Sequence, residues 1–323
     1  MAVYVNTNYS ALQGQRYLGN VQNQLTTTYQ RLSSGMRINS AKDDAAGLQI
    51  ADRLTSQING LNQGNRNASD GIALAQTAEA GMDEISGMLQ KIRTLAVQAN
   101  NGTNTLEDRK ALAKEASALA TEVSRIATQT TYAGKTILNG KQTNSLDPLA
   151  GNAAPPGPGA AGGAGSTQSI TLQVGSNKGD TISFGLVNLQ FSVAAKAATV
   201  PDAKINAQAA DTVAFKTAGD KSITVNFSSA GMAAEIIGYM DQMIGYVDSQ
   251  RADLGATQNR LESSIRNQSN VAANEADARS RIRDADFAEE SANLSQQSII
   301  QQAAASMLMQ ANTRPQLGLS LLG

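Results

Sequence analysis

The side chains that most often carry enzyme chemistry are missing from this chain of 323 residues, which contains no cysteine and no histidine. Without cysteine there are no disulfides, thiol nucleophiles or thiolate metal ligands. Without histidine there is no serine–histidine–aspartate triad, no HExxH zinc motif and no imidazole base near neutral pH. We therefore predict no catalytic site, no metal site and no cofactor.

Two acidic doublets remain as candidates for acid–base chemistry or metal binding, Asp43–Asp44 and Glu289–Glu290. Adjacent residues on a helix point about 100° apart, so neither doublet converges on one atom. Carboxylates in the first turn of a helix interact favourably with the positive end of the helix dipole. We interpret both doublets as capping or solvated groups. Serine, lysine, aspartate and glutamate could still serve an enzyme, but nothing in the sequence places them together.

A glycine-rich motif lies near the middle of the chain, where residues 157–162 (GPGAAG) match GxGxxG. A nucleotide-binding turn needs a strand before the motif and a helix after it. Here Pro155 and Pro156 precede the motif and more glycines follow it. We interpret residues 150–165 as a flexible linker or exposed loop.

Charge and hydropathy limit the classes of partner that the sequence indicates. The chain has 26 basic and 27 acidic residues, so no nucleic-acid or polybasic membrane partner is indicated. It has no run of about 18 apolar residues, so we expect no membrane insertion. Residues 1–15 have neither a basic leader nor an apolar core, so no cleaved signal peptide is expected. Export would then need a route other than the general secretory pathway.

Long helices with heptad spacing are expected to form the main body of the fold. Apolar residues recur at alternating intervals of three and four, with one slip, from about residue 44 to residue 99, which is typical of helices wrapped side by side. Thr105 starts another such helix, with Glu107 and Asp108 in its first turn, and a third begins near Ala230. The fold class we predict is mainly α: an elongated antiparallel helical bundle or coiled coil, with paired N- and C-terminal helices and a small β-rich central insert.

The insert covers residues 145–229. Two β-branched runs at residues 169–174 and 181–187 predict a hairpin. Three weaker strand candidates lie at residues 189–195, 212–217 and 222–229.

The two ends of the chain are amphipathic and opposite in charge. Residues 1–42 carry four basic and no acidic side chains, whereas residues 284–323 carry four acidic side chains and one basic one. We expect the two ends to pair, steered by this charge difference. The C-terminal end is also too apolar for a soluble monomer. Two interpretations remain open, burial against the N-terminal helix and burial between subunits, and the second is favoured because two thin helices cannot cover each other completely.

The sequence resembles bacterial flagellin, the subunit of the flagellar filament. The matching segments lie at both ends of the chain and in the right order. They are residues 31–53 (RLSSGMRINSAKDDAAGLQIADR), 65–85, 89–100, 254–265 (LGATQNRLESSI), 278–290 (ARSRIRDADFAEE) and 306–323 (SMLMQANTRPQLGLSLLG).

This resemblance implies three regions. The terminal helices, residues 1–43 and 280–323, would form the inner core of a tubular filament. Residues 44–144 and 230–279 would form the helical rod around it, and residues 145–229 a variable region facing outward. The residues expected to assemble subunits are Leu12, Leu18, Leu25, Arg31, Leu32, Met307, Leu308, Leu317, Leu321 and Leu322.

The resemblance also implies partners and a location. The chain would polymerise with itself outside the cell after export through the flagellar type III system. An export chaperone would cover the C-terminal segment, and filament cap and hook-junction proteins would meet the helix ends. A coiled-coil secreted adhesin or a cap-junction protein is the alternative, and an enzyme is a distant third.

Receptor recognition is a further implication. The contact residues of Toll-like receptor 5 ligands carry over to Lys91, Leu95 and Glu115. Many recognised flagellins have arginine in place of Lys91, and arginine makes a planar bidentate contact that lysine cannot. We expect recognition, with a weaker contact at this position. Arg283 is a second departure, since the family commonly has an acidic residue there.

Overall fold

The computed structural model describes residues 7–140, 168–198, 200, 214–217 and 223–320. Contacts divide the chain into two compact units, one formed by Met1–Asn59 with Asn270–Gly323 and the other by Gly60–Ser269. The glycine-rich linker of residues 150–165 lies outside the described residues.

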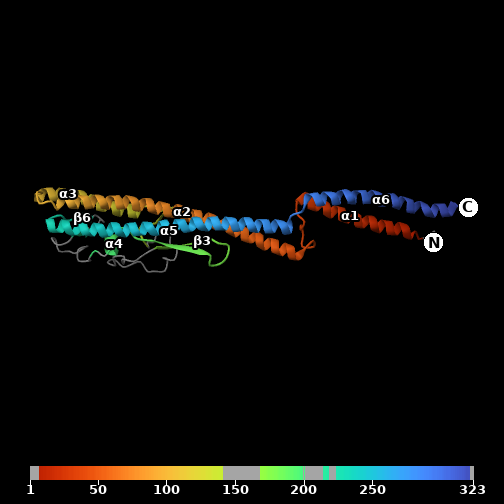
Figure 1. The fold of residues 1–323 in the computed structure, drawn as a ribbon, viewed down its shortest axis with the longest axis horizontal. Coiled ribbons are helices and arrows are strands. Elements are labelled where there is room, and N and C mark those ends of the chain that lie inside the picture. Colours follow the sequence, from red (N-terminus) through yellow and green to blue (C-terminus); the bar gives the residue numbers. More distant parts are fainter. Residues whose placement is uncertain (1–6, 141–167, 199, 201–213, 218–222, 321–323) are drawn as a thin grey trace. The chain divides into compact units, whose positions relative to one another are not determined.

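The described part of the chain is mainly α-helical (Figure 1). Its helices are α1 (Tyr9–Ser34), α2 (Ala45–Ala99), α3 (Leu106–Gln129), α4 (Phe191–Ala197), α5 (Ala230–Arg283) and α6 (Phe287–Ser320). The strands pair antiparallel as β1 (Thr131–Tyr132) with β2 (Lys135–Thr136), β3 (Gln168–Gln173) with β4 (Thr181–Leu186), and β5 (Phe215–Thr217) with β6 (Ile223–Val225). The predicted fold class is confirmed, including the pairing of the N- and C-terminal helices.

In the first unit, the segment that follows α1 pairs with the short break between α5 and α6. Gly35 caps α1 in the left-handed conformation, with φ 68°, which glycine adopts without steric cost. The amide of Arg37 donates to the carbonyl oxygen of Arg283 at 2.7 Å, and the amide of Ala285 donates to that of Gly35 at 3.0 Å. Backbone hydrogen bonds therefore connect the segment after α1 to the break between α5 and α6.

The acidic doublet at the start of α2 has the predicted capping role. Asp43 accepts hydrogen bonds from the amides of Asn39 and Ser40, and Asp44 accepts one from the amide of Gly47. The bonds from Ser40 and Asn39 lower the pKa of the exposed Asp43 carboxyl below its usual value. A carboxylate that accepts amide bonds is stabilised in its charged form.

In the second unit, α2, α3 and α5 share one apolar core. Met82, Ile85, Leu89 and Ile92 of α2 are almost completely buried, as their heptad spacing predicts. Antiparallel α2 and α5 are linked by the ion pairs Arg93–Asp241 and Asp83–Arg251.

Helix α3 begins as predicted. Thr105 and Asp108 form a reciprocal capping box, in which each side chain accepts the other's backbone amide. Such caps contribute about 1 kcal/mol to helix stability.

The central insert confirms the expected hairpin but corrects one strand. Residues 189–195 were expected to be extended, whereas Phe191–Ala197 form α4. Phe191, Ala194 and Ala195 are buried at helical spacing, and the Phe191 ring packs edge-on against Phe215 at a centroid distance of 5.1 Å. Burial on one helical face outweighs the weak strand signal of a segment rich in alanine.

Candidate functional site

The terminal pair, α1 with α6, forms an antiparallel seam with heptad spacing, and the two helices lie side by side in Figure 1. On α1 the least exposed positions recur at intervals of four and three, and the same holds on α6. The α1 positions are Gly14, Leu18, Val21, Leu25, Thr28 and Leu32, and the α6 positions are Glu290, Leu294, Gln297, Gln301, Ala304, Leu308 and Ala311. Gly14 lets α6 approach, because an added Cβ there would lie 3.3 Å from Leu308 Cδ1.

Polar contacts at three levels fix the register of this seam. The Asn8 side-chain amide donates to the carbonyl oxygen of Ala311 at 2.8 Å. The Thr28 hydroxyl donates to the Gln297 amide oxygen at 3.3 Å. Near the other end, Arg31 Nη1 donates to Glu290 Oε1 at 3.1 Å. Each contact joins α1 or its N-cap residue to α6, and the residues it joins lie 259 to 303 positions apart in the chain.

The seam leaves several large apolar side chains of the terminal pair uncovered. Large side chains on both helices remain more than half exposed: Tyr9, Leu12, Tyr17, Tyr29, Phe287, Ile299, Met307 and Met309. At 100° per residue, Met307 and Met309 lie on opposite flanks of Leu308, which faces α1. Ile299, nine positions before Leu308, lies on the side of α6 opposite to α1. Helix α6 thus carries large apolar side chains on its outward sides as well as toward α1, which favours burial on more than one side.

The structure separates the predicted assembly residues into two groups. Leu18, Leu25, Arg31, Leu32 and Leu308 lie half-buried in the seam. Leu12 is 53% exposed and Met307 is 69% exposed, so both point away from it. Leu317 belongs to α6, whereas Leu321 and Leu322 lie outside the described residues.

Sequence reasoning missed most of the outward residues. Tyr9, Tyr17, Phe287, Ile299 and Met309 are exposed but were not among the predicted assembly residues. The signal was present, because a helical projection with Val21 at the centre of the α1 seam places Tyr9 about 120° away from it.

The predicted receptor residues come together on the second unit. Lys91 of α2 and Glu115 of α3 form an exposed ion pair of 3.7 Å. Leu95 lies one helical turn after Lys91, but it is only 8% exposed and packs in the core. Lys91 and Glu115 therefore form an exposed polar surface, and Leu95 is buried in the core beneath them.

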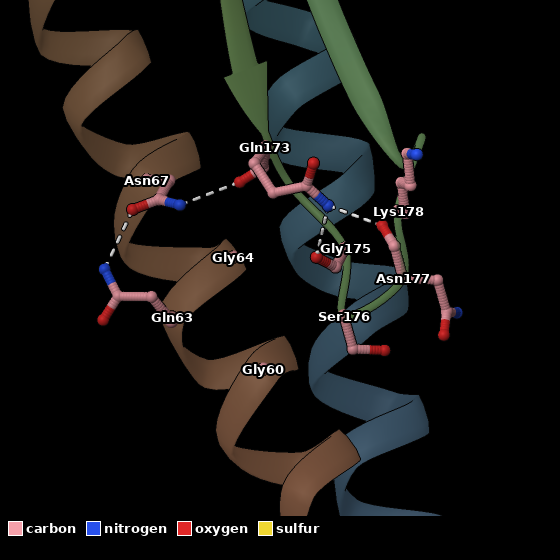
Figure 2. Close-up of a pocket in the computed structure, with 9 residues that line it drawn as sticks. All are labelled: Gly60, Gln63, Gly64, Asn67, Gln173, Gly175, Ser176, Asn177 and Lys178. Atoms are coloured by element: carbon pink, nitrogen blue, oxygen red, sulfur yellow. Dashed lines mark hydrogen bonds between the residues drawn. The ribbon is translucent and has the colours of Figure 1, made fainter.

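A hollow of about 340 Å³ lies in the second unit between α2 and the turn of the β3–β4 hairpin. Figure 2 shows that its polar side chains satisfy one another: Asn67 donates to the carbonyl oxygen of Gln173 at 2.8 Å, and Gln63 donates to the Asn67 side chain at 2.9 Å. An added Cβ at Gly60 would lie 2.8 Å from Ser176 Cβ, so glycine is needed for this approach. These contacts anchor the hairpin on α2.

Two further features bear on function within the described residues. No helix there is both long enough and apolar enough to cross a membrane. No three acidic side chains there gather into a candidate metal site.

Comparison with known proteins gives consistent matches along the chain. Residues 5–143 match the N-terminal helical region of bacterial flagellin, and residues 237–322 match its C-terminal helical region. Flagellin A of Vibrio cholerae is 37% identical over 403 aligned positions, and flagellin A of Vibrio anguillarum is 37% identical over 382. Both alignments cover the whole of each chain.

A solved structure with the same fold has been matched over most of the chain. It is a Vibrio parahaemolyticus protein provisionally assigned as flagellar hook-associated, with a TM-score of 0.52 and 14% sequence identity. The match covers 75% of this chain and 100% of that one.

Proposed function

Because the chain belongs to the bacterial flagellin family and is a structural subunit of the flagellar filament, we propose that α1 and α6 drive polymerisation. They would do so by burying their outward apolar side chains between neighbouring copies. The protein acts outside the cell, where its partners in the filament are other copies of itself.

The observation that supports this proposal is the exposure of large apolar side chains on the outward sides of α6. Helix α1 covers one side of α6 only, while Ile299, Met307 and Met309 stay exposed on the others. Complete burial of a large apolar side chain contributes about 1.5–3 kcal/mol. Because α1 leaves these side chains uncovered, neighbouring subunits are the natural source of this burial.

Membership of the flagellin family also supports a division of the chain into three regions. We propose that residues 1–43 and 280–323 form the inner core of the filament and residues 44–144 and 230–279 the surrounding rod. Residues 145–229 would face outward. The contact-defined units divide at residues 59/60 in α2 and 269/270 in α5, and both divisions lie further from the chain ends than the boundaries proposed here.

The outward surface of the terminal pair also has a consequence before assembly. We propose that a flagellar chaperone covers the C-terminal segment inside the cell, because it would otherwise expose an apolar patch. Export would use the flagellar type III channel. Filament cap and hook-junction proteins would meet the same helix ends.

Recognition by Toll-like receptor 5 belongs to the second unit. We propose that the receptor contacts Lys91 and Glu115 on the rod surface, while the buried Leu95 helps to hold α2 in place beneath them. The exposure of the Lys91–Glu115 pair supports this proposal.

The assembly proposal is tested by one charge placed on the outward side of α6. Ile299→Asp should abolish filament formation, because a carboxylate would be buried between subunits without a partner. Ile299→Met is the matched control, since it keeps an apolar side chain of similar volume at the same position. Electron microscopy after salt-induced assembly gives the readout. Normal filaments from Ile299→Asp would overturn the proposal.

A further inference from the structure

Methionine is the sulfur-containing residue type of this chain, since it has nine methionines and no cysteine. It also lacks tryptophan. Peroxides therefore meet no thiol, and the methionine thioethers are the side chains they oxidise first. Which thioethers react is decided by exposure.

The described methionines differ sharply in exposure. Met82, Met240 and Met243 are at most 1% exposed in the core of the second unit, and Met36, Met88 and Met232 are half-buried. Met307 is 69% exposed and Met309 is 66% exposed. The two readily accessible thioethers of the described residues thus lie two positions apart on α6.

We propose that Met307 and Met309 are the oxidation-sensitive sites of the unassembled subunit, and that their conversion to sulfoxides blocks polymerisation. This inference rests on the proposed function, because it requires that neighbouring subunits bury both side chains. In the reaction a thioether sulfur attacks a peroxide oxygen, the O–O bond breaks, and a sulfur–oxygen bond forms. The sulfur loses two electrons, and hydrogen peroxide is reduced to water.

The consequence for assembly follows from polarity. A sulfoxide is polar and chiral, whereas the thioether it replaces is apolar and flexible. Burying a polar group without a hydrogen-bond partner lowers an association constant on the order of ten- to a hundredfold. The flanks of Leu308, which face away from α1, are therefore the positions where one added oxygen disturbs assembly while leaving the seam intact. Filaments should protect both residues, because assembly would cover them.

The test treats purified monomers with hydrogen peroxide, maps the oxidised residues by peptide mass spectrometry, and follows assembly by light scattering. We expect oxygen to be added to Met307 and Met309 well before Met36, Met88 or Met232, and assembly to slow at least tenfold. Methionine sulfoxide reductases that act on both epimers should restore the rate. The same treatment of preformed filaments should leave Met307 and Met309 unoxidised.

Paired variants identify the residues responsible. The double variant Met307→Leu/Met309→Leu keeps apolar side chains of similar volume, so it should assemble normally and stay insensitive to peroxide. Met36→Leu should remain as sensitive as the original protein. A double variant that loses assembly after peroxide, or an oxidised original protein that assembles at the untreated rate, would overturn the inference. Untreated protein that fails to assemble would instead contradict the proposed function.

Discussion

Arg31 and Glu290 form an ion pair of 3.1 Å across the seam between α1 and α6, and they lie 259 positions apart in the chain. The Glu290 side chain is 9% exposed and the Arg31 side chain 31% exposed. A carboxylate so deeply buried depends on its partner, because an unpaired buried charge is strongly unfavourable. The pair therefore fixes which turn of α1 meets which turn of α6.

Removing one member of this pair should loosen the seam. Arg31→Leu leaves Glu290 buried without its partner, and we expect a loss of about 1–3 kcal/mol in the local stability of α1. Hydrogen exchange of the α1 amides measures this loss. The double variant Arg31→Leu/Glu290→Leu should recover most of it, because no unpaired charge remains. If the double variant loses as much as the two single variants summed, the pair has no coupling and the register argument fails.

The glycines of α2 give a second prediction. An added Cβ at Gly64 would collide with the backbone carbonyl of Val174, whereas one at Gly87 would have no neighbour within 4 Å. Gly64→Ala should therefore displace the β3–β4 hairpin and destabilise the second unit by about 1–3 kcal/mol. Gly87→Ala, its matched control on the same helix, should stabilise it by up to about 1 kcal/mol.

Denaturant unfolding and hydrogen exchange of residues 168–174 measure both effects. Equal stabilisation by the two substitutions would show that the hairpin does not need a glycine at residue 64.

Much of the fold could be predicted because heptad positions report burial directly. Ile85, Leu89 and Ile92 are at most 1% exposed, and α3 begins after Thr105, as its sequence predicted. The pairing of the two chain ends followed from their opposite charges. These features depend on neighbours close in sequence or on patterns repeated along one helix.

The remainder depended on contacts between distant segments. Phe191 lies in a helix because Phe215 and the core cover one face of that helix. Gly64 reads as an ordinary helix-weakening residue until Val174 is placed against it. Similarly, Leu12 appeared to continue the α1 stripe, yet the seam passes through Gly14 and leaves Leu12 exposed. No local pattern contains the identity of such partners.

Acid should loosen the start of α3 selectively. Hydrogen bonds from the Thr105 hydroxyl and amide lower the pKa of Asp108 below its usual value of 3.8. Because the folded-state pKa is lowered, the stabilisation is present above pH 3.8 and is lost as the pH falls through the folded value. Hydrogen exchange at residues 106–110 should show this loss of protection below about pH 4.

The Asp108→Asn variant provides the comparison. It has no carboxylate to protonate, so its protection at residues 106–110 should be lower at neutral pH and insensitive to acid. An acid response identical to that of the original protein would assign the effect to other groups.

The receptor proposal gives a prediction at Lys91. Lys91→Arg should tighten binding to Toll-like receptor 5 by about threefold to tenfold, because a guanidinium can donate two parallel hydrogen bonds where an ammonium acts as a point charge. Lys110→Arg is the control, since Lys110 is equally exposed and pairs with Glu107 on the same rod. Surface plasmon resonance with the receptor ectodomain measures both variants. Unchanged affinity for Lys91→Arg would exclude a bidentate contact there.

The central claim is that the terminal helices are needed to join subunits but not to fold the rod. Deleting residues 310–323 removes the end of α6 and leaves the core of the second unit intact. Electron microscopy and circular dichroism of this truncated protein test the claim together. We predict a helical, cooperatively unfolding protein that forms no filaments under any salting-out condition that polymerises the full chain. Filaments of normal appearance from the truncated protein would contradict the account.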